Sequence, residues 1–243
     1  MKTVRRKITL ITNIVLVVAF TAVFAVSFFP QQALPIYGGT DVSALYNGNR
    51  SGNGVSLMFN VYENTEIVEK IVDVLDVYQA KATFFVGGCW ADDNGNTLNK
   101  IVSGGHEIAN HGYFHKDHAA LDYATNREEI YLTGVVVKAL CGYSPALFAP
   151  PSGSYSAATL QAAADLGYTV IMWSKDTIDW RDKDVKTVFA RSTKNLAGGD
   201  LILMHPKEHT LAALPQIIEY CKNNGFDLVT VSENISTKNT QTT

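Results

Sequence analysis

Short apolar segments alternate with longer segments of helical periodicity along most of this sequence, and this alternation restricts the fold more than any other feature. Short apolar runs bounded by turn residues are typical of buried strands. They occur at residues 55–59, 83–86, 147–149, 169–173, 201–204 and 228–231, with a weaker seventh run at 107–109. Seven strands separated by helices predict a parallel sheet whose faces are covered by those helices.

The segments between these runs carry signals for the start and end of helices. Helices are expected at residues 65–78, 125–140, 157–166 and 214–223. Thr125 and Glu128 have the spacing of a capping box, and Ser156 is a favourable N-cap. Gly167 ends the third helix, and Pro215 fits the first turn of the last one. About 180 residues in this arrangement are enough for a closed or nearly closed barrel. The alternative is an open doubly wound sheet, although no glycine-rich phosphate loop follows the first strand.

Composition excludes several classes of protein. Of the 243 residues, 47% are hydrophobic and 18% are charged, which is the usage of a globular chain and rules out a disordered one. The formal net charge of −3 offers no strongly basic surface, so we expect no nucleic-acid partner. Cys89, Cys141 and Cys221 show no CxxC spacing and cannot form a disulfide framework, so we expect three small buried apolar side chains.

The first thirty residues carry the pattern of a membrane anchor. Residues 8–29 contain no charge, and a helix of that length spans roughly 33 Å, enough for a hydrocarbon core of about 30 Å. The basic residues before it are expected to stay in the cytoplasm, which places the rest of the chain outside the cell membrane. A cleaved signal peptide, with Ala25-Val26-Ser27 as its cleavage site, and a buried core helix are the alternatives.

This pattern divides the chain into five parts. We expect a cytoplasmic basic tail at 1–7, a single-pass signal anchor at 8–29, a linker at 30–53, a folded extracytoplasmic domain at 54–235 and a flexible tail at 236–243. The linker is expected because this segment is rich in Gly, Asn, Gln, Ser and Pro, and the tail because it lacks apolar residues.

Polar side chains follow the predicted strands at the end where parallel α/β proteins carry out their chemistry. Asn60 follows the first strand, and His111 and His115 follow the third. Asp176 follows the fifth strand and His205 the sixth. Each residue alone is a weak signal, but five polar side chains at one edge of a sheet predict a functional site.

His111 and His115 are four residues apart. Two neutral imidazoles at this spacing converge on one metal ion if the segment forms a helical turn. A nitrogen-rich site favours Zn, Co or Ni over Mg or Ca. The alternative is a pair of surface histidines in a loop. Of the two histidines that flank the pair, we interpret His106 as a structural turn residue and His118 as solvated.

His205 directly follows a buried strand, where it is either functional or a core histidine with satisfied hydrogen bonds. Asp176 and Asp179 lie in the segment WSKDTIDW, which ends at Trp180. A carboxylate beside an imidazole raises the pKa of that imidazole and fixes its tautomer, as a general acid requires. The alternatives for the aspartates are a helix N-cap or a solvated loop. Trp180 is either a core residue or a platform on which a sugar ring stacks.

Several segments, in this order along the chain, resemble the NodB-type polysaccharide deacetylases, which are metal-dependent carbohydrate esterases. The resemblance covers about residues 54–233. The matching segments are KATFFV at 81–86, GHEIANH at 105–111 with His115, FAPP at 148–151, WSKD at 173–176 with Trp180, LILMH at 201–205 and LVTVSE at 228–233.

The resemblance implies a distorted (β/α)7 barrel that removes N-acetyl groups from peptidoglycan or another extracellular polysaccharide. It implies that His111 and His115 bind a divalent metal, with Zn expected before Co or Ni. It also implies that His205, held by Asp176, protonates the leaving amine.

The resemblance also implies contacts with the substrate. A backbone N–H near Ser152 stabilises the oxyanion in such a site. Trp180 and Leu203 shape the pocket for the sugar or its acetyl group.

The first motif departs from the family pattern. The family reads Thr-Phe-Asp-Asp-Gly where residues 58–62 here read Met-Phe-Asn-Val-Tyr. Asn60 stands in the place of the aspartate that acts as general base, and an amide has no basic lone pair near pH 7. Val61 replaces an aspartate that binds the metal, and Ala149 replaces the arginine that supports the base. The base and its arginine are therefore missing together, while Asp176 and His205 are retained.

Three functions remain open from the sequence. The protein either retains de-N-acetylation, or is a catalytically impaired carbohydrate-binding or scaffold module, or uses its metal site for another hydrolysis. Glu63 or Glu66 is a candidate replacement for the missing base, because both follow the first strand. The alternative for these two glutamates is the N-terminus of a helix, where the macrodipole favours acidic side chains.

Overall fold

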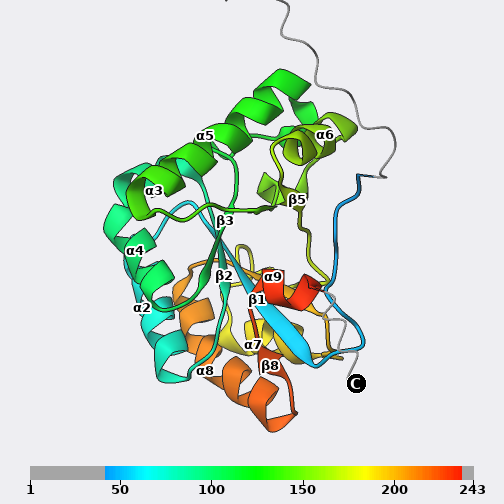
Figure 1. Ribbon diagram of the computed structural model, residues 1–243. Coiled ribbons are helices and arrows are strands. Elements are labelled where there is room, and N and C mark those ends of the chain that lie inside the picture. Colours follow the sequence, from blue (N-terminus) through cyan, green and yellow to red (C-terminus); the bar gives the residue numbers. More distant parts are fainter. Residues whose placement is uncertain (1–41, 237–243) are drawn as a thin grey trace, which may run out of the picture. The chain divides into compact units, whose positions relative to one another are not determined.

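The computed structural model describes residues 42–236 as one folded unit (Figure 1). Its strands are β1 (Gly54–Val61), β2 (Thr83–Val86), β3 (Glu107–Asn110), β4 (Leu147–Phe148), β5 (Thr169–Val170), β6 (Lys175–Asp176), β7 (Leu201–Met204) and β8 (Asp227–Leu228). Its helices are α2 (Thr65–Val77), α3 (Gly88–Asp93), α4 (Gly95–Ser103), α5 (Tyr123–Cys141), α6 (Ala157–Asp165), α7 (Val185–Thr193), α8 (Glu208–Asn223) and α9 (Val231–Ile235). Two short 3-10 helices lie at His118–Ala120 and Pro151–Gly153. Figure 1 shows the longer helices on the outside of the strands.

The strands form one parallel sheet in the order β5-β4-β3-β2-β1-β7-β6, and β8 pairs with the start of β1. β5 and β6 lie at opposite ends of this order, yet only residues 171–174 separate them in the chain. Such a link reaches at most about 17 Å, so the sheet must curl until its two ends approach each other. The result is a distorted, incompletely closed barrel, as the family resemblance implies.

Residues 42–53 belong to this fold, although the sequence places them in a linker. Leu45 forms a parallel bridge with Ile171: its N–H donates to Val170 O at 2.9 Å, and Met172 N–H donates to Leu45 O at 2.7 Å. Arg50 forms an ion pair with Asp200 at 2.7 Å. The predicted start of the folded domain at residue 54 is therefore wrong, because this segment lies along the open edge of the barrel.

Other boundaries also differ from the sequence predictions. The run at 228–231 ends as a strand at Leu228, because Thr230 and Glu233 form a capping box that starts α9. α5 begins after Asp122, whose side chain accepts from Thr125 N, so Thr125 is not its cap. α8 begins at Glu208, which places Pro215 inside the helix and not in its first turn.

Helices α3, α4 and α7 and strand β6 were not predicted, because their segments are short: six, nine, nine and two residues. Of the three cysteines, only Cys221 is buried as expected, and burial raises its pKa to about 12. Cys89 is exposed and Cys141 is half-buried, which contradicts the prediction for these two.

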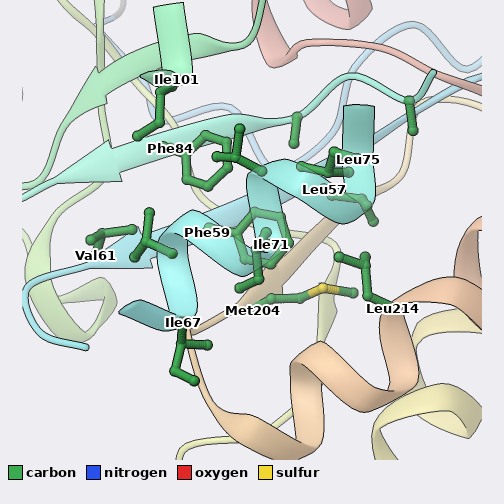
Figure 2. Packing of buried hydrophobic residues seen from close by; sticks show 14 of the residues in the cluster. Leu57, Phe59, Val61, Ile67, Ile71, Leu75, Phe84, Ile101, Met204 and Leu214 are labelled. Carbon is green, nitrogen blue, oxygen red and sulfur yellow. The ribbon is translucent and has the colours of Figure 1, made fainter. Parts of the chain in front are cut away.

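The alternation of side chains along β1 separates the core from the barrel interior. Leu57, Phe59 and Val61 point to the helices and pack in one apolar cluster (Figure 2). The other members labelled there come from α2, β2, α4, β7 and α8: Ile67, Ile71, Leu75, Phe84, Ile101, Met204 and Leu214. Met58 packs on the opposite side of the strand, in a second cluster inside the barrel. Because successive strand residues face opposite ways, Asn60 also faces the interior, near the carboxyl end of β1.

Within residues 42–236, no helix combines the length and apolar character needed to cross a membrane. The predicted anchor at 8–29 and most of the predicted tail at 236–243 lie outside the described residues.

Candidate active site

A pocket of about 310 Å³ opens at the carboxyl ends of the strands. Its lining residues are Asn60, Tyr62, His111, His115, Ser152, Trp173, Asp176, Trp180, Leu203 and His205. The structure therefore brings all eight of the predicted site residues together. Tyr62 and Trp173 were missed. Tyr62 stands two positions after Asn60, and the period of two along a strand is the signal that could have placed it on the same side.

Asn60 is almost fully buried at the base of this pocket. Its Oδ1 atom is buried without a hydrogen-bond partner within residues 42–236. A buried acceptor without a partner is costly unless a ligand or water supplies a donor. The position expected for the general base therefore carries a neutral amide that is ready to accept a hydrogen bond and unable to take up a proton.

Val61 faces away from the pocket. It is fully buried and packs in the apolar cluster between β1 and the helices (Figure 2). The residue that replaces the family's metal-binding aspartate is thus part of the core, and a carboxylate there would need a bound metal ion to pair its charge.

His111 is nearly fully buried where β3 ends. Its Nδ1 atom lies 2.7 Å from the carbonyl oxygen of Ala149, so Nδ1–H donates and Nε2 carries the lone pair. Burial, with the positive charge that His115 would carry as a smaller cause, lowers the pKa of His111 to about 3. The imidazole is therefore neutral at physiological pH.

His115 reaches the pocket from a loop and not from a helical turn. Gly112 (φ 74°) and His115 itself (φ 54°) are left-handed, which breaks any helix between the two histidines. Gly112 also lacks room for a side chain, because a Cβ there would lie 2.9 Å from Nε2 of His118. The rings of His111 and His115 nevertheless meet edge to face, with centroids 5.2 Å apart. Burial lowers the pKa of His115 as well.

A buried glutamate on α5 holds this loop. Glu129 Oε2 accepts hydrogen bonds from the backbone N–H groups of Tyr113 at 2.9 Å and Phe114 at 2.7 Å. Its Oε1 forms an ion pair with Lys116 at 2.8 Å. His118 was predicted to be solvated, and this is wrong. Its side chain is fully buried and its Nδ1 lies 2.7 Å from Asn126 Oδ1.

The carboxylate that contacts His205 is Asp179, which corrects the prediction of Asp176. His205 Nδ1–H donates to Asp179 Oδ1 at 2.7 Å, and the backbone N–H of His205 donates to Oδ2 at 2.7 Å. Thr210 on α8 also donates to Oδ2 at 2.7 Å. Burial alone would raise the pKa of Asp179, but the hydrogen bonds, led by that from His205, outweigh it and lower the pKa.

Asp176 lines the pocket without holding His205. Its Oδ1 accepts from the backbone N–H of Ile178 at 2.7 Å, in a short local turn. Ile178 has a left-handed backbone conformation (φ 53°). The chain bends at this residue, and the carboxylate of the next residue, Asp179, contacts His205. The sequence offered both aspartates, and only the bend at Ile178 decides between them.

The side of the pocket formed by β4 and β6 offers backbone and aromatic groups. Ser152 is left-handed (φ 55°) in the turn after Pro151, and this turn faces the pocket. Trp180 is 55% exposed, with the Arg181 guanidinium 5.9 Å from its ring centroid. Trp180 is therefore an exposed residue and not a core residue.

Tyr62 lies over the two histidines. Its ring centroid is 4.3 Å from that of His115 and 6.5 Å from that of His111. The two glutamates considered as replacement bases do not line the pocket. Glu63 forms an ion pair with Lys207, and Glu66 forms one with Lys70 at 2.7 Å on the outside of α2.

The residues present do not fit the three-ligand metal site that the family implies. His111 and His115 supply two nitrogens, but the third position holds Val61, which faces the core. Within residues 42–236, no group of three or more His, Cys, Asp or Glu side chains is arranged to hold a metal ion. Imidazole nitrogens suit Zn, Co or Ni, and a two-histidine site holds any of them more weakly than three ligands would.

Comparison with known proteins identifies the family. The family model for polysaccharide deacetylases matches residues 47–171, slightly more than half of the 243 residues. A peptidoglycan-N-acetylglucosamine deacetylase from Bacillus cereus is 31% identical over 191 residues, which cover 76% of this chain and 70% of that protein. The chain belongs to the polysaccharide deacetylase family, whose members in general depend on a metal ion.

Two further relatives have altered or unassigned activity. The protein YlxY from Bacillus subtilis is 36% identical over 189 residues, and the matched part of this chain spans only 59% of its length. The structure of BA3943, a CE4 family pseudoenzyme from Bacillus anthracis, matches with a TM-score of 0.78 and 29% identity over 81% of this chain and 70% of that one. A BA3943 mutant with restored enzymatic activity gives the same TM-score at 28% identity.

Proposed function

We propose that the protein binds N-acetylated glycan strands of peptidoglycan in this pocket and removes their acetyl groups slowly or not at all. The observation that carries this proposal is Asn60, a buried amide with an unpartnered oxygen at the position of the general base. An acetamido group has an N–H that this oxygen can accept from, so the pocket retains a means of recognising the substrate after losing the base.

The relatives support the choice of ligand. The Bacillus cereus relative is a peptidoglycan-N-acetylglucosamine deacetylase, and the folded domain here shares its family and most of its length. BA3943 supports the loss of activity, because it is a pseudoenzyme of similar fold. Trp180 and Tyr62 offer exposed aromatic faces at the pocket, as expected of a site that binds sugar rings.

Residual de-N-acetylation is the second candidate, and the observation that favours it is the pair of His205 and Asp179. Hydrolysis of an amide requires a base that takes a proton from water and an acid that protonates the leaving amine. Asp179 fixes the tautomer of His205 so that its second nitrogen can serve as the acid. The base side offers no carboxylate at Asn60. This candidate also requires that His111 and His115 bind a divalent metal such as Zn, Co or Ni.

The location of the protein is part of the proposal. Residues 8–29 are uncharged and follow a basic cluster, which favours a single-pass anchor in the cell membrane with the folded domain outside. Protease added to cells without their wall should then remove the domain. A domain that survives this treatment would contradict the location.

Glycan binding and acetate release, measured on the same protein, test the function. The full chain should bind oligomers of N-acetylglucosamine and bind the de-N-acetylated oligomers at least about tenfold more weakly, with acetate release near background. Trp180→Ala should weaken binding about fivefold or more, since truncating an aromatic side chain at the centre of a binding site commonly costs more than about 1 kcal/mol. Tyr131→Ala, at an exposed tyrosine on α5 outside the pocket, is the matched control. Acetate release at a rate similar to that of the Bacillus cereus relative would support the second candidate instead.

A further inference from the structure

We propose that the ring of Tyr62 closes the histidine pair to metal ions and turns it into the aromatic floor of a sugar-binding pocket. The first half of this inference stands on the geometry alone, and the second half rests on the proposed function. The residue occupies the position of the glycine that ends the family's first motif, so the ring is a departure from the family pattern.

The two histidines alone do not exclude a metal. Their rings lie edge to face with centroids 5.2 Å apart, and His111 has its Nε2 free because Nδ1 is bound to the Ala149 carbonyl. Two imidazoles so close together can converge on one ion. The feature that stands against an ion is the aromatic ring placed over them.

The Tyr62 ring is in direct contact with His115. A centroid distance of 4.3 Å is shorter than the range of about 4.5–7 Å usual for packed aromatic pairs. A ring in contact with His115 competes for the space that the water ligands of an ion bound to the two histidines would need. The ring lies 6.5 Å from His111 at an interplanar angle of 27°, so it is within the distance range of an aromatic pair with each of the two histidines.

The position of Tyr62 is restricted by the backbone around it. Gly87, whose N–H donates to Val61 O at 2.8 Å, lies beneath the start of the side chain. A Cβ on Gly87 would lie 3.5 Å from the Cβ of Tyr62, so the two residues are in van der Waals range. Gly87 therefore lies next to the Cβ of Tyr62, and the Tyr62 ring packs on His115.

The outer face of the ring remains accessible. Tyr62 is 39% exposed and lines the pocket together with Trp180, which is 55% exposed. No hydrogen bond to the Tyr62 hydroxyl is found within the described residues, so the contacts of this side chain are made by its ring. Two aromatic faces and the buried oxygen of Asn60 together form a site for a neutral sugar with an acetamido group.

Zinc titration separates this inference from a purely structural role for Tyr62. The full chain and Tyr62→Phe should bind Zn²⁺ weakly, whereas Tyr62→Ala should bind it at least tenfold more tightly. Adding His111→Ala and His115→Ala to Tyr62→Ala should abolish this gain. Tyr131→Ala, at an exposed tyrosine on α5, is the control for the loss of a tyrosine elsewhere. Circular dichroism should show that every variant is folded, and Tyr62→Ser replaces Tyr62→Ala if that variant is not.

Three results would overturn the closed histidine pair. They are a Tyr62→Ala variant that binds Zn²⁺ no better than the unaltered chain, a gain that survives loss of both histidines, and a Tyr62→Phe variant that gains binding like Tyr62→Ala. The last result would assign the effect to the hydroxyl and not to the ring.

The glycan measurement distinguishes this inference from the proposed function. Tyr62→Ala should weaken binding of N-acetylglucosamine oligomers at least tenfold, and Tyr62→Phe should leave it within twofold. If the unaltered chain binds no glycan, the proposed function and the sugar-binding half of the inference both fail, while the zinc result still decides the closed histidine pair. Unchanged glycan binding by Tyr62→Ala would contradict the aromatic floor alone.

Discussion

The two sides of the pocket differ in how their polar groups are partnered. On the side of β7, Asp179 is buried and each of its oxygens accepts at least one hydrogen bond, including one from His205. On the side of β1, Asn60 has a buried oxygen with no partner among residues 42–236, and Val61 belongs to the apolar core. One side therefore keeps the arrangement of a working acid, while the other has lost its charges.

The residues on the base side are consistent with one another. A carboxylate at Asn60 would need a cationic partner, and Ala149 offers none. An arginine left at 149 without a carboxylate would in turn be an unpaired buried charge. The absence of a carboxylate at Asn60 therefore fits the absence of an arginine at Ala149, and the Tyr62 ring packs on His115. On the acid side, the Asp179 carboxylate has its hydrogen-bond donors within the protein.

The largest effect is expected from restoring the base side. Asn60→Asp, Val61→Asp, Tyr62→Gly and Ala149→Arg together should raise acetate release from chitin oligomers by about 10²–10⁴-fold in the presence of Zn²⁺, which is the contribution typical of general acid–base catalysis. The same variant with Tyr62 retained should stay near background, because its ring still covers the histidines.

The restored variant also buries new charge, so its folding must be checked by circular dichroism. The rationale is consistent with BA3943, for which a mutant has restored enzymatic activity. A folded four-residue variant that gains nothing, with His205→Ala also without effect on it, would show that the acid side is not functional either.

The second prediction tests the acid side through stability. Asp179→Ala leaves the N–H groups of His205 and the hydroxyl of Thr210 without their acceptor, so it should lower the free energy of unfolding by about 3 kcal/mol. Asp176→Ala removes one local hydrogen bond at a half-buried site and should cost about 1 kcal/mol or less. Urea denaturation of both variants provides the comparison. Equal losses would contradict the assignment of Asp179 as the partner of His205.

The third prediction concerns pH. Burial, with His115 as the smaller cause, lowers the pKa of His111 in the folded protein to about 3, whereas an unfolded histidine titrates near 6.5. As the pH falls, the unfolded state takes up the proton first. The stability contribution is therefore complete above about pH 6.5 and is lost as the pH falls toward 3, by at most about 1.4 kcal/mol per pH unit.

His111→Asn should flatten this dependence between pH 6.5 and 4, measured by urea denaturation with EDTA present, because an amide can still donate to Ala149 O but does not titrate. An identical slope in the variant and the unaltered chain would mean that other groups, such as His118, dominate the acid sensitivity.

The sequence predicted the composition of the pocket better than its contacts. Asn60, His111 and His205 follow buried strands, and the common direction of parallel strands is enough to gather such residues at one edge. The choice between Asp176 and Asp179 depends on one left-handed residue between them, and residue types do not specify such a bend.

The segment at 42–53 shows a second limit of sequence prediction. Its turn-forming composition is typical of a linker, but Leu45 and Arg50 bind positions more than a hundred residues away. Local composition cannot report such distant partners, since they are determined only when the sheet curls.

The smallest effect is expected for the two glutamates that follow β1. Glu63→Gln and Glu66→Gln should each leave glycan binding, and any acetate release, within about twofold of the unaltered chain, as is usual for substitutions away from a site. Glu63 is held by Lys207 and Glu66 by Lys70, and neither lines the pocket. Glu66 lies in the first turn of α2, where the helix dipole favours an acidic residue.

A tenfold fall in acetate release with Glu63→Gln would identify Glu63 as the missing base. Loss of the ion pair between Glu63 and Lys207 does not explain such a fall, whereas loss of a proton acceptor does. Both sides of the pocket would then contribute a group that transfers a proton, and de-N-acetylation would be favoured over glycan binding alone as the function.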